Sequence, residues 1–233
     1  MTPAARIILD EVDSTMAEAA RRAPALVGPT WILARHQSAA KGRRGRPWQQ
    51  STGNFAATLV MPVAPRHAAL RSFTASLALA EACAAFGVDD LRQKWPNDVL
   101  VGGGKVAGIL LEMLPNDRLA IGIGVNLRHA PDAADMEPGA TPPATLDLDL
   151  SPESFLDALA PRVADWEARF ATYGFPPVRD AWLAHAAKLG EPIRARTVTE
   201  EHHGVFETID NEGRLVLSTA KGHVTIPAAD VYF

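Results

Sequence analysis

Cationic side chains are concentrated in one short stretch of this sequence, although the chain of 233 residues carries a formal net charge of -4. No acidic residue interrupts the stretch, and Gly42 and Gly45 within it give the backbone freedom to move. Guanidinium groups present planar pairs of donors that suit phosphate or carboxylate oxygens. The stretch therefore predicts a loop that closes over an anion. Its cationic residues are Arg35, Lys41, Arg43, Arg44 and Arg46.

A second stretch that could do chemistry covers residues 94–112 and reads KWPNDVLVGGGKVAGILLE. Pro96 holds the preceding residue out of helical geometry, and Gly108 within a strand pattern indicates close approach by a ligand or another part of the backbone. On this stretch alone, Lys105 is either an exposed turn residue or a fixed charge that faces a pocket. Asp98 is either a turn former or an acceptor for a metal or a donor group.

Two common phosphate-binding motifs are excluded by the spacing of the glycines. A P-loop requires G-x-x-x-x-G-K-[ST], but Val99 replaces the first glycine and Val106 follows the lysine. The dinucleotide pattern G-x-G-x-x-G fails because Leu127 replaces the last glycine after Gly122 and Gly124. Any nucleotide is therefore bound by another scheme.

Short apolar runs alternate unevenly with helical patterns and predict the elements that must hold these residues. Several runs follow one another directly, and a glycine turn at 102–104 separates two of them, so part of the sheet is expected to be antiparallel. This pattern favours a mixed α+β domain over a doubly wound parallel sheet. The predicted strands are 6–10, 31–36, 55–61, 91–95, 97–101, 105–114 and 118–126.

Helical periodicity occurs between these runs. The first helix is expected to start near Ser14 or Thr15, because Thr15 and Glu18 have the spacing of a capping box. The other segments are a helix at 68–86, a helix at 151–173 with a kink or restart expected at Pro161, and a long surface connection at 128–150.

After residue 190 the pattern changes to short strands separated by turns, which predicts a small β-barrel. So small a module is expected to depend on packing against the main domain for its stability. Its predicted strands are 193–198, 204–209, 215–218 and 224–226.

Composition bounds the class of protein. The 47% content of hydrophobic residues is ample for a packed core. The absence of a long apolar run or a signal-peptide pattern predicts a cytoplasmic protein with no membrane partner. The single cysteine, Cys83, is expected to be a small buried hydrophobe. The acidic total argues against broad electrostatic attraction to DNA.

Four segments, taken in order, strongly resemble the biotin–protein ligase family. They are Asp13-Ser14-Thr15, QSAAKGRRGRPW at 37–48, KWPND with KVAGILLE at 94–112, and GIGVN at 122–126. The resemblance implies a mixed sheet with helices, like that of class II aminoacyl-tRNA synthetases and biotin ligases, at residues 1–188. A small SH3-like β-barrel would follow at residues 189–233.

The activity that the resemblance implies has two steps. Biotin, the substrate, attacks the α-phosphorus of ATP to give biotinyl-5'-AMP and pyrophosphate, with Mg²⁺ assisting at the triphosphate. A lysine amine of the partner then attacks this mixed anhydride. The partner would be the biotin carboxyl carrier protein domain of a biotin-dependent carboxylase, such as acetyl-CoA carboxylase.

Site residues carried over from the family include no metal ligand. Catalytic roles fall to Lys105, Arg43 and Asp98, of which Asp98 would orient the acceptor lysine or take its proton. The implied biotin contacts are Ser14, Thr15, Gln37, Lys41, Gly42, Arg43, Lys105 and Gly108. The implied nucleotide contacts are Arg43, Arg44, Arg46, Trp48, Asn97, Lys105 and Asn126. On sequence alone Trp48 is equally a loop anchor.

The sequence departs from the family pattern at the loop, where Ala40 and Lys41 replace a glycine and an arginine, and at Met16, where a polar residue is common. The motifs begin at Asp13, which leaves no room for the DNA-binding domain that some members carry, so no DNA partner is expected. A monomer or a homodimer is expected by analogy.

Three alternatives stay open at this point. A lipoate or octanoate ligase shares the adenylation chemistry and differs in the acyl pocket. A nucleic-acid-binding module would use the arginines and Trp48 to grip phosphate and stack a base. A homologue that binds biotin without turnover is the third.

Overall fold

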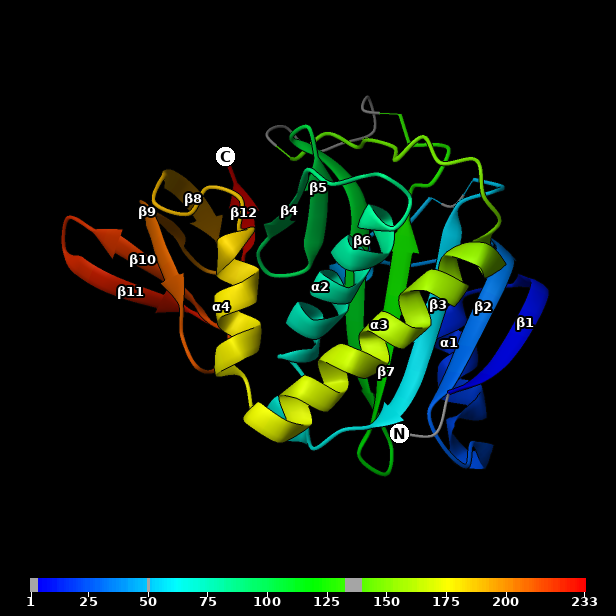
Figure 1. Cartoon of the computed structure of the whole chain (residues 1–233). Helices are drawn as coiled ribbons and strands as arrows, with labels where there is room; N and C mark the ends of the chain where they lie inside the picture. Colours follow the sequence, from blue (N-terminus) through cyan, green and yellow to red (C-terminus); the bar gives the residue numbers. More distant parts are fainter. Residues whose placement is uncertain (1–3, 50, 133–139) are drawn as a thin grey trace.

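The computed structural model describes residues 4–49, 51–132 and 140–233. Its main feature is a seven-stranded sheet in the order β1-β2-β3-β7-β6-β5-β4 (Figure 1). The seven strands predicted for this sheet are all present, with ends shifted by at most two residues. Their bounds are β1 Ala5–Val12, β2 Thr30–Gln37, β3 Phe55–Pro62, β4 Leu91–Lys94, β5 Asp98–Val101, β6 Gly104–Leu114 and β7 Arg118–Val125.

The sheet is mixed, as the sequence predicts. β1 and β2 pair in parallel because helix α1 (Thr15–Arg22) crosses between them, and all other neighbours in this sheet are antiparallel. The glycine turn at 102–104 joins β5 to β6, with Gly102 and Gly103 at positive φ.

A register shift in the β5–β6 pair decides which side chains share a face. Asp98 lies opposite Gly108, but Leu100 lies opposite Lys105, so β6 contains one extra residue. In a regular strand, residues three apart point to opposite faces, whereas a bulge restores them to the same face. Lys105 and Gly108 therefore share one face, and an atom added at the Cβ position of Gly108 would lie 3.4 Å from Lys105 Nζ.

Helices cover both faces of this sheet. Helices α2 (Arg71–Ala84) and α3 (Pro152–Tyr173) pack over one face and enclose the larger core (Figure 1). Helix α1 covers the other face through Met16 and Ala19, which contact a smaller cluster of sheet residues. No helix in the part of the chain that the structure describes is both long and apolar enough to cross a membrane.

One local prediction about the helices is wrong, and one of the two alternatives given for Pro161 does not occur. Ser14 caps α1 by accepting a hydrogen bond from Met16 N at 3.2 Å, and Glu18 pairs with Arg21 and Arg22, so the Thr15–Glu18 capping box does not form. Helix α3 runs through Pro161 without a restart. The apolar stripe from Phe155 to Phe170 is buried on both sides of the proline and holds the two halves in one helix.

The C-terminal strands form a five-stranded antiparallel sheet in the order β11-β10-β9-β8-β12. Its outer strands, β11 and β12, do not pair with each other within residues 189–233, so the predicted barrel is present as an open sheet. Strand β12 and helix α4 (Pro176–Ala184) are not predicted from the sequence, because three residues at a chain end and a helix that opens with two prolines give little periodicity. The bounds are β8 Pro192–Arg196, β9 Glu201–Ile209, β10 Leu215–Thr219, β11 Gly222–Ile226 and β12 Asp230–Tyr232.

One apolar core spans the large and small sheets. Trp182 of α4 meets Phe206 of β9 edge-on, with ring centroids 6.5 Å apart. Trp95 Nε1 donates a hydrogen bond to the carbonyl of Gly213 at 2.9 Å. The core cluster accordingly includes residues on both sides of position 188. These contacts agree with the expectation that the small module packs on the main body.

The predicted connection at 128–150 contains no helix or strand in its described parts, 128–132 and 140–150; residues 133–139 of it lie outside the described residues. It is not only a surface crossing. Lys105 N donates to the carbonyl of Pro142 at 2.7 Å, and Ala144 N donates back to the carbonyl of Lys105 at 2.8 Å. The connection therefore runs beside the start of β6.

Candidate active site

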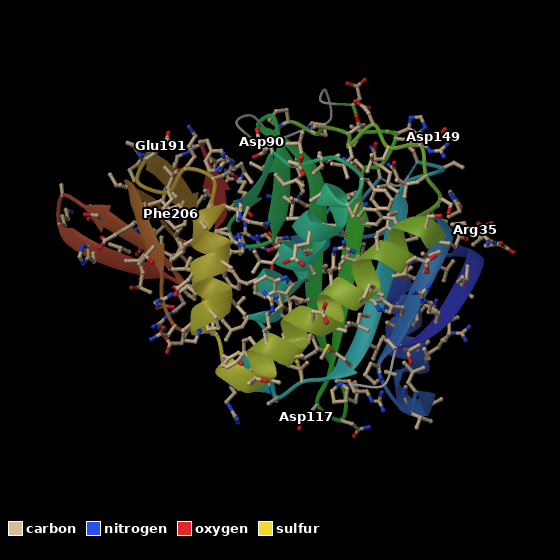
Figure 2. All side chains as sticks on the ribbon, viewed as in Figure 1. Arg35, Asp90, Asp117, Asp149, Glu191 and Phe206 are labelled. Carbon is tan, nitrogen blue, oxygen red and sulfur yellow. The ribbon has the colours of Figure 1, made fainter. Side chains whose placement is uncertain are left out.

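A cavity of about 550 Å³ opens at the end of the large sheet where β6 begins and β7 ends. The β6–β7 turn, marked by Asp117 in Figure 2, lies at the opposite end. Of the predicted site residues, all except Arg44 line this cavity: Ser14, Thr15, Gln37, Lys41, Gly42, Arg43, Arg46, Trp48, Asn97, Asp98, Lys105, Gly108 and Asn126. Residues far apart in the sequence thus converge on one space.

The floor of the cavity is made of glycine backbone. Gly108 of β6 lies directly opposite Gly124 of β7, so two neighbouring strands lack side chains at the same level. The Trp48 ring covers this floor, since a Cβ atom on Gly124 would lie 2.6 Å from it and one on Gly108 would lie 3.1 Å from it. The space above Gly108, one of the implied biotin contacts, is taken by the indole, which must move if a ligand is to lie there.

Lys105 and Asp98 form an ion pair at the edge of this floor, with Lys105 Nζ 2.7 Å from Asp98 Oδ1. Both side chains are largely buried, with 27% and 18% of their surfaces exposed. Lys105 Nζ also lies 5.5 Å from the centroid of the Trp48 ring, a cation–π arrangement. The structure thus places Lys105 in the pocket, and the exposed-turn alternative does not hold.

The cationic loop is an ordered hairpin. Lys41 pairs with Pro47 in an isolated antiparallel bridge, Gly42 N donates to the carbonyl of Arg46 at 2.8 Å, and Trp48 N donates to that of Ala40 at 2.9 Å. Its tip turns at a left-handed pair, Arg44 with φ 56° and Gly45 with φ 71°. The loop therefore presents its arginines in fixed directions.

Arg43 points inward and is partly buried. Its Nη1 donates to Asn97 Oδ1 at 3.2 Å, and both of its Nη atoms lie 3.4 Å from the carbonyl oxygen of Ala229. Burial lowers the pKa of the Arg43 guanidinium, while the negative charges of Asp230 and Asp98 oppose that shift. A guanidinium in this environment is poorly solvated and disposed to bind an anion.

Arg35 belongs to a different place. It lies on β2 and pairs with Asp10 and Glu153. Figure 2 shows Arg35 at the edge of the molecule away from the small sheet. The cationic stretch in the sequence thus divides into a surface ion-pair network at Arg35 and a loop that begins at Lys41. The first prediction, one loop from 35 to 46, is wrong in this respect because β2 extends to Gln37.

The polar end of the cavity is built around the start of α1. Thr15 N donates to Gln37 Oε1 at 2.7 Å, and the Thr15 hydroxyl accepts from Thr58 at 2.9 Å. The Met16 thioether lies against Gly122, where a Cβ atom would come within 2.7 Å of its sulfur. Met16 therefore contributes an apolar wall at the position where the family commonly has a polar residue.

The two asparagines have backbone partners in this state. Asn97 Nδ2 donates to the carbonyl of Ile109 at 2.8 Å, and Asn126 Nδ2 donates to that of Ala144 at 3.0 Å. Asn126 thereby ties the connection at 140–150 to the end of β7. Any contact of these amides with a nucleotide remains a prediction.

Lys94 and Asp230 line the cavity and were missed by the sequence analysis. Lys94 is 7% exposed, donates a hydrogen bond to Thr141 and lies 4.9 Å from the Phe233 ring centroid. Burial lowers the pKa of its ammonium group. The first lysine of KWPND was a usable signal for Lys94. For Asp230 there was none, because a lone carboxylate near the end of the chain has no motif.

Two family models match the sequence. The biotin/lipoate A/B protein ligase family matches residues 8–127, and the biotin protein ligase C-terminal domain matches residues 188–233. The chain belongs to the biotin/lipoate protein ligase family. The family match at 188–233 coincides with the small sheet, although that sheet is open.

Relatives in the family agree over nearly the whole chain. A biotin–[acetyl-CoA-carboxylase] ligase of Paracoccus denitrificans is 52% identical over 97% of this chain and 99% of its own length. The bifunctional ligase/repressor BirA of Bacillus subtilis is 30% identical over 87% of this chain, which spans 65% of that protein. The fold matches the biotin protein ligase of Aquifex aeolicus in complex with biotin and ATP, with a TM-score of 0.84 at 23% identity over 97% of each chain.

Proposed function

We propose that this protein is an ATP-dependent biotin–protein ligase, which activates biotin as biotinyl-5'-AMP and transfers it to a lysine of a biotin carboxyl carrier protein domain. The observation that carries the proposal is the convergence of Lys105 and the Arg43 loop on one cavity above a glycine floor. The 52% identity to a biotin–[acetyl-CoA-carboxylase] ligase supports biotin as the acyl group and that carboxylase as the source of the acceptor.

The first step joins two anions. The biotin carboxylate attacks the α-phosphorus of ATP, the bond to the β-phosphate oxygen breaks, and pyrophosphate leaves with the electron pair. Fixed cations lower the barrier by cancelling repulsion and stabilising the charge that develops on the phosphate. Lys105 and Arg43 are the cations that we assign to this step. Arg46 and Lys41 line the same cavity and add positive potential.

Lys105 is held ready for this role by its environment. The β6 bulge turns it toward the floor, and Asp98 compensates its charge at 2.7 Å. The carboxylate of biotin and the α-phosphate of ATP would replace Asp98 as the anionic partners of the Lys105 ammonium group.

In the second step the acceptor amine attacks the carbonyl carbon of the mixed anhydride, and AMP leaves. The attacking nitrogen must lose a proton. We assign this proton to the Asp98 carboxylate, which is released from its ion pair when Lys105 turns to the adenylate. Asp98 lines the cavity and is 18% exposed, so an amine from solvent can reach it.

The arginine loop has a further part in the proposal. Biotinyl-adenylate is hydrolysed by water, so a loop that covers it preserves the intermediate until the acceptor arrives. Trp48 at the end of the loop is positioned to move from the glycine floor and pack against the bound nucleotide.

Mg²⁺ belongs to the proposal as a companion of the triphosphate. Among the residues that the structure describes, no group of three or more His, Cys, Asp and Glu side chains could hold a metal ion. Phosphate oxygens would therefore supply most of its ligands, as is common for Mg²⁺ in nucleotide sites. No step of the proposed reaction depends on a metal position.

Biotin-dependent exchange of labelled pyrophosphate into ATP tests the first step, and mass spectrometry of a purified carrier domain tests the second. Exchange with biotin and one added biotinyl group per carrier domain are expected. Exchange with lipoate but none with biotin would overturn the biotin assignment. Exchange with neither acid would overturn the ligase assignment. The cytoplasmic location, the monomer or homodimer state and the absence of a DNA partner stay predictions.

A further inference from the structure

Three arginines of the cationic loop converge on one carboxylate of the small sheet. Asp230 Oδ2 lies 2.8 Å from Arg44 Nη1 and 3.2 Å from Arg46 Nη2, and Asp230 Oδ1 lies 3.9 Å from Arg43 Nη1. Asp230 begins β12, the strand of the small sheet that lies toward the large sheet in Figure 1. The loop and the carboxylate are separated by more than 180 residues of sequence, as the Arg44–Asp230 separation of 186 shows.

The carboxylate is well placed to hold the loop. The Asp230 side chain is only 13% exposed, so its ion pairs are less screened than those of a surface aspartate. The neighbouring carbonyl of Ala229 adds the contacts to Arg43 at 3.4 Å. The small sheet therefore offers the loop one full negative charge and one carbonyl dipole.

The loop needs such a partner. Arg43, Arg44 and Arg46 lie within four residues of one another, and their like charges disfavour a compact hairpin. The tip also contains Arg44 in the left-handed region, at φ 56°. Three carboxylates belong to the described cavity lining, Asp98, Asp132 and Asp230. Asp98 pairs with Lys105, and Asp230 faces all three arginines.

We infer that Asp230 is a stand-in anion, which holds the cationic loop at the cavity and gives up its guanidinium partners to the phosphate oxygens of a bound nucleotide. This inference rests on the proposed function for the identity of the incoming anion. Asp230 is thus a positioning residue that acts through the arginines and forms no bond to a reacting atom. The small sheet thereby controls the state of the loop before substrate binds.

Limited trypsin digestion of the full chain tests the empty state. Trypsin can cleave after Lys41, Arg43 and Arg44, whereas Pro47 protects the bond after Arg46, and Asp230→Asn leaves all of these sites intact. The loop of Asp230→Asn should be cut roughly tenfold faster than that of the unmodified protein, as expected for loss of partly buried charged hydrogen bonds. Asp230→Glu should restore most of the protection.

Two further variants separate this effect from misfolding. Glu207→Gln removes an exposed carboxylate of the same sheet that pairs with His223, and its loop should be cut at the unmodified rate. Arg44→Gln removes the shortest contact from the loop side without altering β12, and cleavage after Lys41 should rise severalfold. Circular dichroism and a thermal melt of each variant show whether the fold is intact.

Trypsin digestion with a bound ligand tests whether phosphate oxygens replace Asp230 as the partner of the arginines. With a saturating, non-hydrolysable phosphoester analogue of biotinyl-adenylate, the unmodified protein and Asp230→Asn should be protected equally, because phosphate oxygens now hold the arginines. Unchanged cleavage of the empty, folded Asp230→Asn would overturn the inference. Persistent cleavage of the liganded variant, with the unmodified protein protected, would overturn it too, since Asp230 would then be a permanent part of the closed loop. An analogue that protects neither protein counts against the proposed function, while the empty-state comparison still decides the role of Asp230.

Discussion

The indole of Trp48 occupies the volume that a side chain on Gly124 would need, with 2.6 Å between the ring and an added Cβ atom. The residue that closes the cationic loop is therefore packed on the glycine floor of the cavity. Ligand entry and loop movement are coupled through this contact, because a ring on the floor excludes any other flat group from it.

Gly124→Ala is predicted to raise the KM for biotin roughly tenfold or more, with little change in folding. An added methyl group forces the ring away and narrows the space above the floor, and a tenfold loss of binding corresponds to about 1.4 kcal/mol. Gly28→Ala is the matched control, since nothing lies within 4 Å of its added Cβ atom. Steady-state pyrophosphate exchange at varied biotin measures the change, and equal KM values for the two variants would contradict the packing argument.

Lys105→Ala is predicted to lower the rate of adenylate formation by at least about 100-fold while the melting temperature stays within a few degrees. Loss of a fixed charge at the site of developing charge has effects of this size. Lys188→Ala, which removes an exposed lysine paired with Glu191, serves as the control and should retain full exchange activity. Near-normal rates for Lys105→Ala would remove this residue from the chemistry.

Arg43→Gly is predicted to weaken biotin binding and to release biotinyl-adenylate into solution. The change removes the contacts to Asn97 and to the Ala229 carbonyl, so the loop loses its inward anchor. Arg43→Lys keeps the charge but not the fork of donors, and it should be intermediate. Chromatography of free adenylate during turnover measures the leak. Tight retention by Arg43→Gly would argue against the loop as a cover.

Cys83, the only cysteine of the chain, is predicted to be an unreactive thiol in the native state and a probe of unfolding. Burial raises the pKa of its thiol to about 12, so the reactive thiolate is scarce at neutral and mildly alkaline pH. Alkylation by iodoacetamide at pH 8 should be at least ~100-fold slower in buffer than in strong urea. Rapid alkylation of protein with an intact circular dichroism spectrum would refute the buried position.

Removing one member of the buried ion pair between Arg71 and Glu167 is predicted to lower the free energy of unfolding more than replacing both members with apolar residues. The two side chains are 9% and 4% exposed and lie 2.8 Å apart. Glu167→Ala should lower the free energy of unfolding by about 3–5 kcal/mol, because it leaves an uncompensated buried charge. The double variant that combines Arg71→Met with Glu167→Leu removes both charges and should cost far less. Urea unfolding measures both, and equal losses would contradict the prediction.

The same pair should leave a pH signature. Burial raises the pKa of the Glu167 carboxyl above its ordinary value of 4.5, so the folded state holds this proton more tightly than the unfolded chain does. The contribution of this group to stability is then full below pH 4.5 and falls as the pH rises through the folded-state pKa. Glu167→Gln should flatten that part of the stability curve. An unchanged slope would show that another group titrates there.

The strands are predicted well because they depend on local patterns, and the members of the cavity because the resemblance to the ligase family carries them over. Apolar runs between turns mark strands such as β3 and β7. The motif residues stand in the order and at the spacing of the family motifs, so each can be matched to a place in the site. What the sequence could not show is set by contacts over long distances. The bulge that turns Lys105 to the face of Gly108 depends on the partner strand, and the pairing of Asp230 with the arginines joins residues as much as 186 positions apart.

Errors at the helix ends have a similar origin. Ser14 and Thr15 are both good capping residues, and the choice between them depends on Gln37 and Thr58, which draw Thr15 into tertiary hydrogen bonds. Pro161 weakens a helix locally, but the buried side chains on either side outweigh that cost. Local sequence preferences therefore point to Ser14, Thr15 and Pro161, and tertiary contacts decide which residue caps the helix and whether the helix continues.

The apolar core that crosses position 188 limits how this protein can be engineered. A chimaera that exchanges the C-terminal sheet for one from a distant ligase would bring a foreign surface against Trp182 and Trp95, and would lose the fit between Phe206 and the indole that it meets. Such a graft would also carry its own residue at the position of Asp230. The C-terminal sheet should therefore be exchanged together with helix α4, which packs against it.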